Sequence, residues 1–95
     1  MEKIVFIKND VEIPIDAKLV SYDKENLVIQ KEDEQNVITL DFKKRTCTLF
    51  LKEEKLELEI PVLNMSYEQM HEYEEFVYTL ESESAAKNVV KIFRG

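Results

Sequence analysis

Short alternation of apolar and polar residues is the dominant pattern along the chain. In the clearest run, residues 56–62, every second residue is leucine, isoleucine or valine, and the residues between are glutamate or proline. A side-chain period of two is typical of a β-strand with one face buried and the other in water. The run therefore predicts that Leu58 and Ile60 face the core and that Glu57 and Glu59 face water.

The same pattern, together with short runs rich in Ile, Val, Phe, Tyr and Thr, predicts nine strands. They lie near residues 3–8, 11–15, 17–23, 26–32, 36–42, 46–53, 55–63, 73–81 and 88–94. Even spacing and short connections indicate hairpins, and hence an antiparallel meander. Residues 3–8 and 46–53 include stretches that are apolar on both faces, which indicates a closed or doubly covered sheet, or a patch that buries against another subunit.

The turns between these strands lack glycine, because the only glycine in the chain is Gly95. Asparagine is the next-best residue for a positive φ. All five asparagines fall at predicted breaks between strands: Asn9, Asn26, Asn36, Asn64 and Asn88. We therefore expect asparagine to form the turns, with Asn9 and Asp10 in a tight hairpin.

Residues 65–82 fit two patterns. Ser66 and Gln69 have the spacing of a helix capping box, and a helical stripe runs through Met70, Tyr73, Val77 and Leu80. Residues 76–80 also alternate as a strand does. We predict a short helical turn or loop at 65–71 followed by a strand, and the alternative is one helix at about 66–82.

The fold class predicted from these elements is all-β. We expect a single domain over residues 1–95, an antiparallel meander that closes or nearly closes into a small barrel. Eight strands give an interior that side chains fill or that holds one small ligand. The alternative architecture is an antiparallel sheet packed by one helix at about 66–82.

Composition and charge limit the classes of partner. The net charge of −7 does not suit binding to nucleic acid, and the one basic run, residues 43–45, is typical of a solvated turn. No apolar run exceeds four residues, so neither a signal peptide nor a membrane span is expected. Cys47 is the only cysteine, which fits a reducing compartment. We expect a cytoplasmic protein.

Few residues could carry chemistry. His71 is the only histidine, and its polar neighbours indicate a solvated surface position. Cys47 alternates with Leu49 and Leu51, which predicts a buried, unreactive thiol. We therefore predict no catalytic, cofactor-binding or metal-binding residue, no cofactor and no enzymatic activity.

Two further groups of side chains have a structural and a functional interpretation. The first comprises six glutamates in a stretch without Lys or Arg: Glu68, Glu72, Glu74, Glu75, Glu81 and Glu83. We predict a solvated acidic face rather than a calcium site, and the next interpretation is a surface for a basic partner. The second group comprises Tyr22, Tyr67, Tyr73 and Tyr78. These are expected to close the ends of the core with their hydroxyl groups at water, and the alternative is a ligand site.

The C-terminal part of the chain resembles a known family. Leu56-Glu57-Leu58-Glu59-Ile60-Pro61-Val62, Phe76-Val77-Tyr78-Thr79-Leu80 and Asn88-Val89-Val90-Lys91-Ile92 resemble the ending of the YwiB-like proteins, over about residues 56–94. These are bacterial calycin-like β-barrels of unassigned function. The resemblance implies a barrel and supplies no catalytic residue, and this chain is shorter and poorer in glycine than the family pattern.

The function expected from these observations is a non-enzymatic interaction or structural protein. In that interpretation an apolar strand face or edge pairs with itself or with a partner protein. The alternative is a binding module that holds a small apolar ligand in a barrel mouth. A pocket larger than about 300 Å³ would favour the ligand, whereas an interior filled by Ile, Leu and Phe favours the interaction protein.

Overall fold

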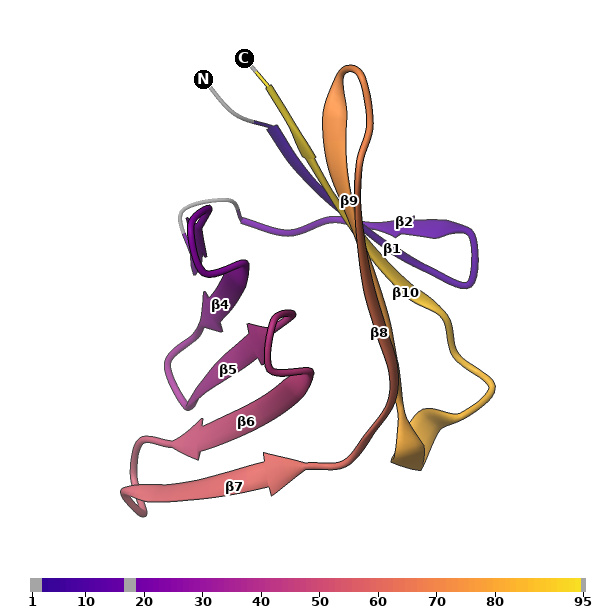
Figure 1. Cartoon of the computed structure of the whole chain (residues 1–95). Coiled ribbons are helices and arrows are strands. Elements are labelled where there is room, and N and C mark those ends of the chain that lie inside the picture. The colour runs from indigo at the N-terminus through magenta and orange to yellow at the C-terminus, as the bar shows by residue number, and fades with distance from the viewer. Residues whose placement is uncertain (1–2, 17–18, 95) are drawn as a thin grey trace.

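The computed structural model describes residues 3–16 and 19–94, and shows two five-stranded sheets (Figure 1). The first sheet has the order β2 (Val11–Ile13), β1 (Lys3–Lys8), β10 (Asn88–Phe93), β9 (Tyr73–Leu80) and β8 (Val62–Gln69). The second sheet has the order β3 (Val20–Asp23), β4 (Val28–Glu32), β5 (Asn36–Asp41), β6 (Thr46–Leu51) and β7 (Leu56–Ile60). A 3-10 turn, η2 (Glu81–Glu83), follows β9. The predicted all-β class is confirmed.

The strands follow the predicted meander, and no closed barrel is detected among the described residues. Every ladder is antiparallel, and every paired strand is next to its partner in sequence except β1, which pairs with β10. This is the strand order of a meander whose first and last strands meet. Among the described residues, however, no ladder joins β2 to β3 or β7 to β8, so the strands divide into two sheets.

The two breaks coincide with the two prolines. Pro14 follows β2, and Pro61 lies between β7 and β8, where the chain bends from one sheet into the other (Figure 1). Proline has no backbone N–H and cannot donate to a ladder. The predicted strands 11–15 and 55–63 run through these prolines, whereas the observed strands stop at them.

Asparagine was expected to supply the positive φ values in the turns, but most of these values occur at other residues. Positive φ values occur at Asn9, Asp10, Leu27, Arg45 and Lys55, so Asn9 is the one asparagine among the described residues with this conformation. Asn36 and Asn88 instead begin β5 and β10, and Asn64 lies inside β8.

Aspartate side chains stabilise three of the turns. Asp23, Asp33 and Asp41 each accept hydrogen bonds from two backbone N–H groups of the residues that follow. At Asp33 the bonds come from Asn36 and Gln35, at 2.7 and 2.8 Å, and they lower the pKa of its carboxyl group. This stabilisation is therefore present at neutral pH and is lost as the pH falls through the pKa of the folded state.

The region of mixed pattern, 65–82, is a β-hairpin. The helical turn or loop predicted at 65–71 is wrong because β8 occupies that segment, and the alternative helix at 66–82 is wrong as well. The strand predicted at 73–81 is confirmed as β9. Met65 lies opposite Tyr78 and Tyr67 lies opposite Phe76, so cross-strand packing outweighs the local capping signal.

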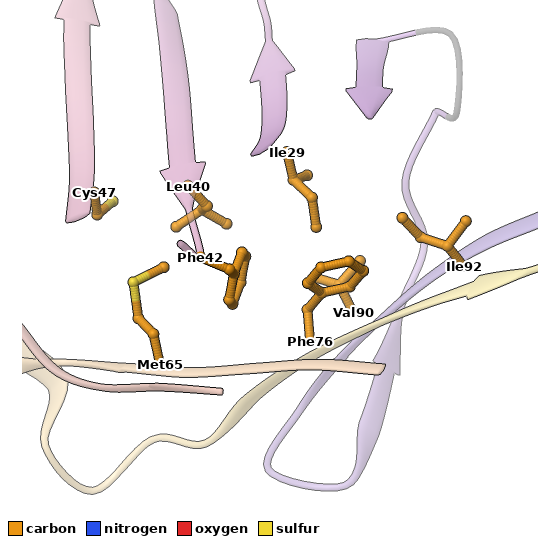
Figure 2. Packing of buried hydrophobic residues seen from close by; sticks show 8 residues of the cluster. All are labelled: Ile29, Leu40, Phe42, Cys47, Met65, Phe76, Val90 and Ile92. Carbon is orange, nitrogen blue, oxygen red and sulfur yellow. The ribbon is translucent and has the colours of Figure 1, made fainter. Parts of the chain in front are cut away.

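The core lies between the facing sides of the two sheets (Figure 2). Ile29, Leu40 and Cys47 lie opposite one another on neighbouring strands of the second sheet. They face Met65, Phe76, Val90 and Ile92 of the first sheet, with Phe42 beside them (Figure 2). The buried side chains of the two sheets therefore form one continuous core.

Phe76 is the centre of this core and is fully buried, with 0% of its surface exposed. Its ring centroid lies 4.8 Å from that of Phe42 and 5.4 Å from that of Tyr22, which both belong to the second-sheet side. Tyr67 of the neighbouring strand lies 4.9 Å away. Phe76 thus connects the two sheets through aromatic contacts, which stabilise a core beyond the burial of area.

Truncating Phe76 should therefore destabilise the protein strongly. Phe76→Ala should lower the free energy of unfolding by about 3–5 kcal/mol, the usual cost of removing a buried aromatic ring. Phe50→Ala is the matched control, because Phe50 is 38% exposed, and its cost should stay below about 1 kcal/mol. Urea melts of the two variants measure both values, and equal costs would contradict the central position of Phe76.

Candidate functional site

The free edge of β7 is the candidate site. β7 is the last strand of the second sheet and pairs with β6 on one side only. Leu56 is 48% exposed and Leu58 is 42% exposed, so the prediction that Leu58 lies in the core is wrong. Ile60 is partly buried against the core, and Glu57 and Glu59 are exposed as expected.

Leu56 and Leu58 continue the core-facing side of the second sheet beyond the core. Leu58 lies opposite Leu49 on β6, and Leu49 lies opposite Ile38 on β5. Leu56 lies opposite Leu51 in the same way. Because residues directly opposite in a ladder share a face, these side chains form an apolar strip, and β7 is its exposed border.

Carboxylates surround this apolar border. Glu57 and Glu59 lie on the other face of β7, and Glu53 and Glu54 are exposed in the turn before it. Within residues 53–59 the only cation is Lys55. The described residues contain ion pairs between Lys8 and Glu83 and between Lys52 and Glu32, and none at Glu57 or Glu59.

The other sheet edges are shorter or less regular. β2 also exposes apolar residues around a glutamate, since Val11 is 65% and Ile13 is 41% exposed on either side of Glu12. β2 has three residues and ends before Pro14, and β3 has four residues. β8 is longer, but its register is interrupted between Val62 and Asn64. Its exposed residues are polar apart from Leu63. A regular ladder edge with exposed leucines is therefore a property of β7.

The outer face of the first sheet is also apolar. Ile7 and Val77 flank Val89 across three neighbouring strands. All three side chains are partly buried by their neighbours, and no free backbone groups accompany them, because β1, β9 and β10 are paired on both sides. This face therefore offers a partner strand less exposed apolar surface and fewer free backbone groups than β7 does.

A small cleft opens between the two sheets. Its volume is about 250 Å³, and it is lined by residues from both sheets that include Phe6, Ile38, Leu40 and Leu80. Binding pockets for small molecules usually measure about 300–1,000 Å³. Larger hollows of 380 and 620 Å³ lie along the second sheet, and most of their lining residues are polar.

The structure places one candidate residue for chemistry in an exposed turn and the other in the core. His71 is exposed in the turn between β8 and β9, and its carbonyl oxygen accepts a hydrogen bond from Arg94. Cys47 is 1% exposed, as predicted. Burial raises the pKa of its thiol to about 11, so the reactive thiolate is disfavoured at neutral pH.

The predicted acidic face contains one buried member. Glu74 is 3% exposed, because it lies on the same side of β9 as Phe76 and Tyr78. Its carboxyl oxygen accepts a hydrogen bond of 2.9 Å from the Tyr67 hydroxyl group. The alternation of β9, which the pattern at 76–80 already indicated, carries Glu74 inward and corrects the prediction for this residue.

Three of the four tyrosines, Tyr22, Tyr67 and Tyr78, pack against the core. Tyr22 and Tyr67 pack against Phe76, and Tyr78 packs against Phe42. Tyr73 stacks on Phe93, with their ring centroids 5.1 Å apart. Burial raises the pKa of Tyr78 to about 12, so its hydroxyl group stays neutral at physiological pH.

The sequence does not point to the β7 edge, because the barrel predicted from it would give this strand a neighbour on both sides. Pro61 was the available signal, since a proline directly after a strand indicates the border of a sheet. In the described part of the chain, no three His, Cys, Asp or Glu side chains are grouped to hold a metal ion. Within residues 3–16 and 19–94, no helix is long and apolar enough to cross a membrane.

Comparison with protein-family models, with curated proteins and with solved structures finds no match for this chain. The resemblance to the YwiB-like proteins over residues 56–94 therefore stays a prediction.

Cys47 should be unreactive in the native protein. A thiol reagent should label it slowly under native conditions and rapidly in concentrated urea, because burial shields the sulfur and raises its pKa. The measurement is the labelling rate by mass spectrometry. Equal rates under the two conditions would contradict the burial of Cys47.

Tyr67→Phe should destabilise the protein by about 1–3 kcal/mol, because it removes the hydroxyl donor to the buried Glu74 and leaves that polar group without this partner. Tyr73→Phe is the matched control, since Tyr73 contributes ring contacts on the outer face. Thermal unfolding of both variants measures the difference. A loss at Tyr73 as large as the loss at Tyr67 would contradict the role of the hydrogen bond.

Proposed function

We propose that this chain is a non-enzymatic interaction protein that binds an extended segment of another polypeptide along the free edge of β7. The observation that carries the proposal is the exposure of Leu56 and Leu58 beside an unpaired ladder edge. Exposed apolar residues on a flat edge strand are a liability for a protein that leaves them uncovered.

A strand added to β7 would extend the second sheet. The main-chain groups on the free side of β7 would pair with those of the incoming segment, and alternate side chains would contact Leu56 and Leu58. In this mode the backbone hydrogen bonds supply affinity, and the side chains supply specificity. The mode needs no pocket and no catalytic group.

The alternative, a module for a small apolar ligand, has less support. The cleft between the sheets measures about 250 Å³, and the side chains of Phe6, Ile38 and Leu80 occupy its walls. This apolar cleft is smaller than the usual pocket of about 300–1,000 Å³. The hollows of 380 and 620 Å³ along the second sheet exceed that lower bound, but most of their lining residues are polar, which does not suit an apolar ligand. The β7 edge, in contrast, offers both apolar side chains and free backbone groups.

The experiment is a binding titration with a fluorescent peptide of alternating valine and lysine residues. Leu56→Ser/Leu58→Ser should weaken binding by at least about tenfold, since two apolar contacts are lost. Leu63→Ser is the matched control, because Leu63 is as exposed but lies on β8, and it should bind like the unmodified protein.

N-methylation of the peptide on alternate residues should also abolish binding, because it removes the donors that a ladder needs. Amide hydrogen exchange of residues 56–59 should slow when the peptide is bound. Binding that survives both the leucine changes and the N-methylation would show that the peptide does not add a strand to β7.

A further inference from the structure

We infer that the segment β7 accepts alternates apolar residues with lysine or arginine, and that Glu57 and Glu59 exclude a second copy of this chain. The inference rests on the proposed function of the β7 edge and names the chemistry of its partner. Two independent features support it: the position of the glutamates in the ladder, and their lack of a cation within their own sheet.

Pairing of β7 with β7 of a second copy brings glutamates together. A continuous sheet keeps the leucines of both strands on one face, because a shift of one residue exchanges the faces. If Leu58 lies opposite its own copy, Glu57 of each chain lies opposite Glu59 of the other. Like charges directly opposite one another destabilise a sheet.

The neighbouring registers do not avoid this repulsion. A shift of one strand by two residues keeps the leucines of both chains on one face. Depending on its direction, it places Glu57 opposite Glu57 of the second copy, or Glu59 opposite Glu59. In the first of these registers Lys55 would lie opposite Glu59, but Lys55 has a φ of 52° and belongs to the turn before β7. It therefore does not supply an extended residue that could neutralise the pair.

No cation of the same sheet neutralises these glutamates. Glu57 lies opposite Phe50 on β6, and Glu59 lies opposite Thr48. In the described residues, the ion pairs join Lys8 to Glu83 and Lys52 to Glu32, so Glu57 and Glu59 remain available. A lysine or arginine on the incoming strand, directly opposite either glutamate, would form a favourable cross-strand pair.

The partner pattern follows from the pleat. Residues opposite Leu56 and Leu58 share their face and are apolar, and residues opposite Glu57 and Glu59 share the other face and are basic. The exposed Glu53 and Glu54 in the turn before β7 add to the negative potential. The edge thus attracts a basic strand and repels an acidic one, including β7 itself.

Three peptides of equal length test the charge pattern: valine alternating with lysine, with threonine and with glutamate. The lysine peptide should bind about tenfold more tightly than the threonine peptide at low salt, and high salt should remove most of the difference. The glutamate peptide should bind weakest. Glu57→Gln/Glu59→Gln should bring the lysine peptide to the affinity of the threonine peptide.

The outcomes separate the two proposals. One outcome is that the lysine and threonine peptides bind equally at low and high salt and that Leu56→Ser/Leu58→Ser abolishes this binding. It would overturn the charge inference and leave the β7 edge as the binding site. Failure of all three peptides to bind would overturn both. Circular dichroism of each variant shows whether it is folded, and the conservative glutamine changes lie at exposed positions.

The chain itself supplies a second test. Glu57→Lys/Glu59→Lys converts β7 into the basic, apolar strand that the inference describes. This variant and the unmodified protein should each be monomeric, and their mixture should form a heterodimer, because each lysine then lies opposite a glutamate. Analytical ultracentrifugation measures this. A stable dimer of the unmodified protein through β7, or a mixture that stays monomeric, would overturn the inference.

Discussion

Aromatic packing around Phe76 holds the two sheets face to face. Phe76 extends from the first sheet, Phe42 and Tyr22 meet it from the second-sheet side, and their ring centroids lie within 5.4 Å of that of Phe76. Because no ladder among the described residues crosses from one sheet to the other, hydrogen-bonded strands do not provide this connection. The relative position of the sheets depends on side-chain packing, in which dense contacts stabilise one arrangement.

The position of the core determines which part of the second sheet is left uncovered. The buried row runs from Ile29 through Leu40 to Cys47 and reaches β7 at Ile60. Leu56 and Leu58, which precede Ile60 in β7, lie beyond the cover of the first sheet, so their side chains meet solvent. Pro61 then ends the strand and bends the chain away. The exposed edge therefore follows from the same features that build the core and the break between the sheets.

The sequence predicts strands well, because the burial of alternate residues is a local pattern that each segment carries by itself. It does not predict how far another sheet covers that face, and for this reason the sequence places Leu58 in the core although it lies beyond the cover of the first sheet. β8 was missed because Ser66 and Gln69 also fit a helix start, and only pairing with β9 decides between the two. The many glutamates of its segment predict that Glu74 lies in solvent, although the alternation around Phe76 directs its side chain inward.

Edge protection is the simplest account of Glu57 and Glu59, since charged residues on an edge strand discourage association with other strands. That account explains the glutamates but not the leucines between them. A strand that needed only protection would be better served by polar residues at positions 56 and 58, because exposed leucine adds no stability and favours aggregation. The combination fits the proposed binding of a basic strand, in which the leucines would make pairing favourable and the carboxylates would restrict it to strands of opposite charge.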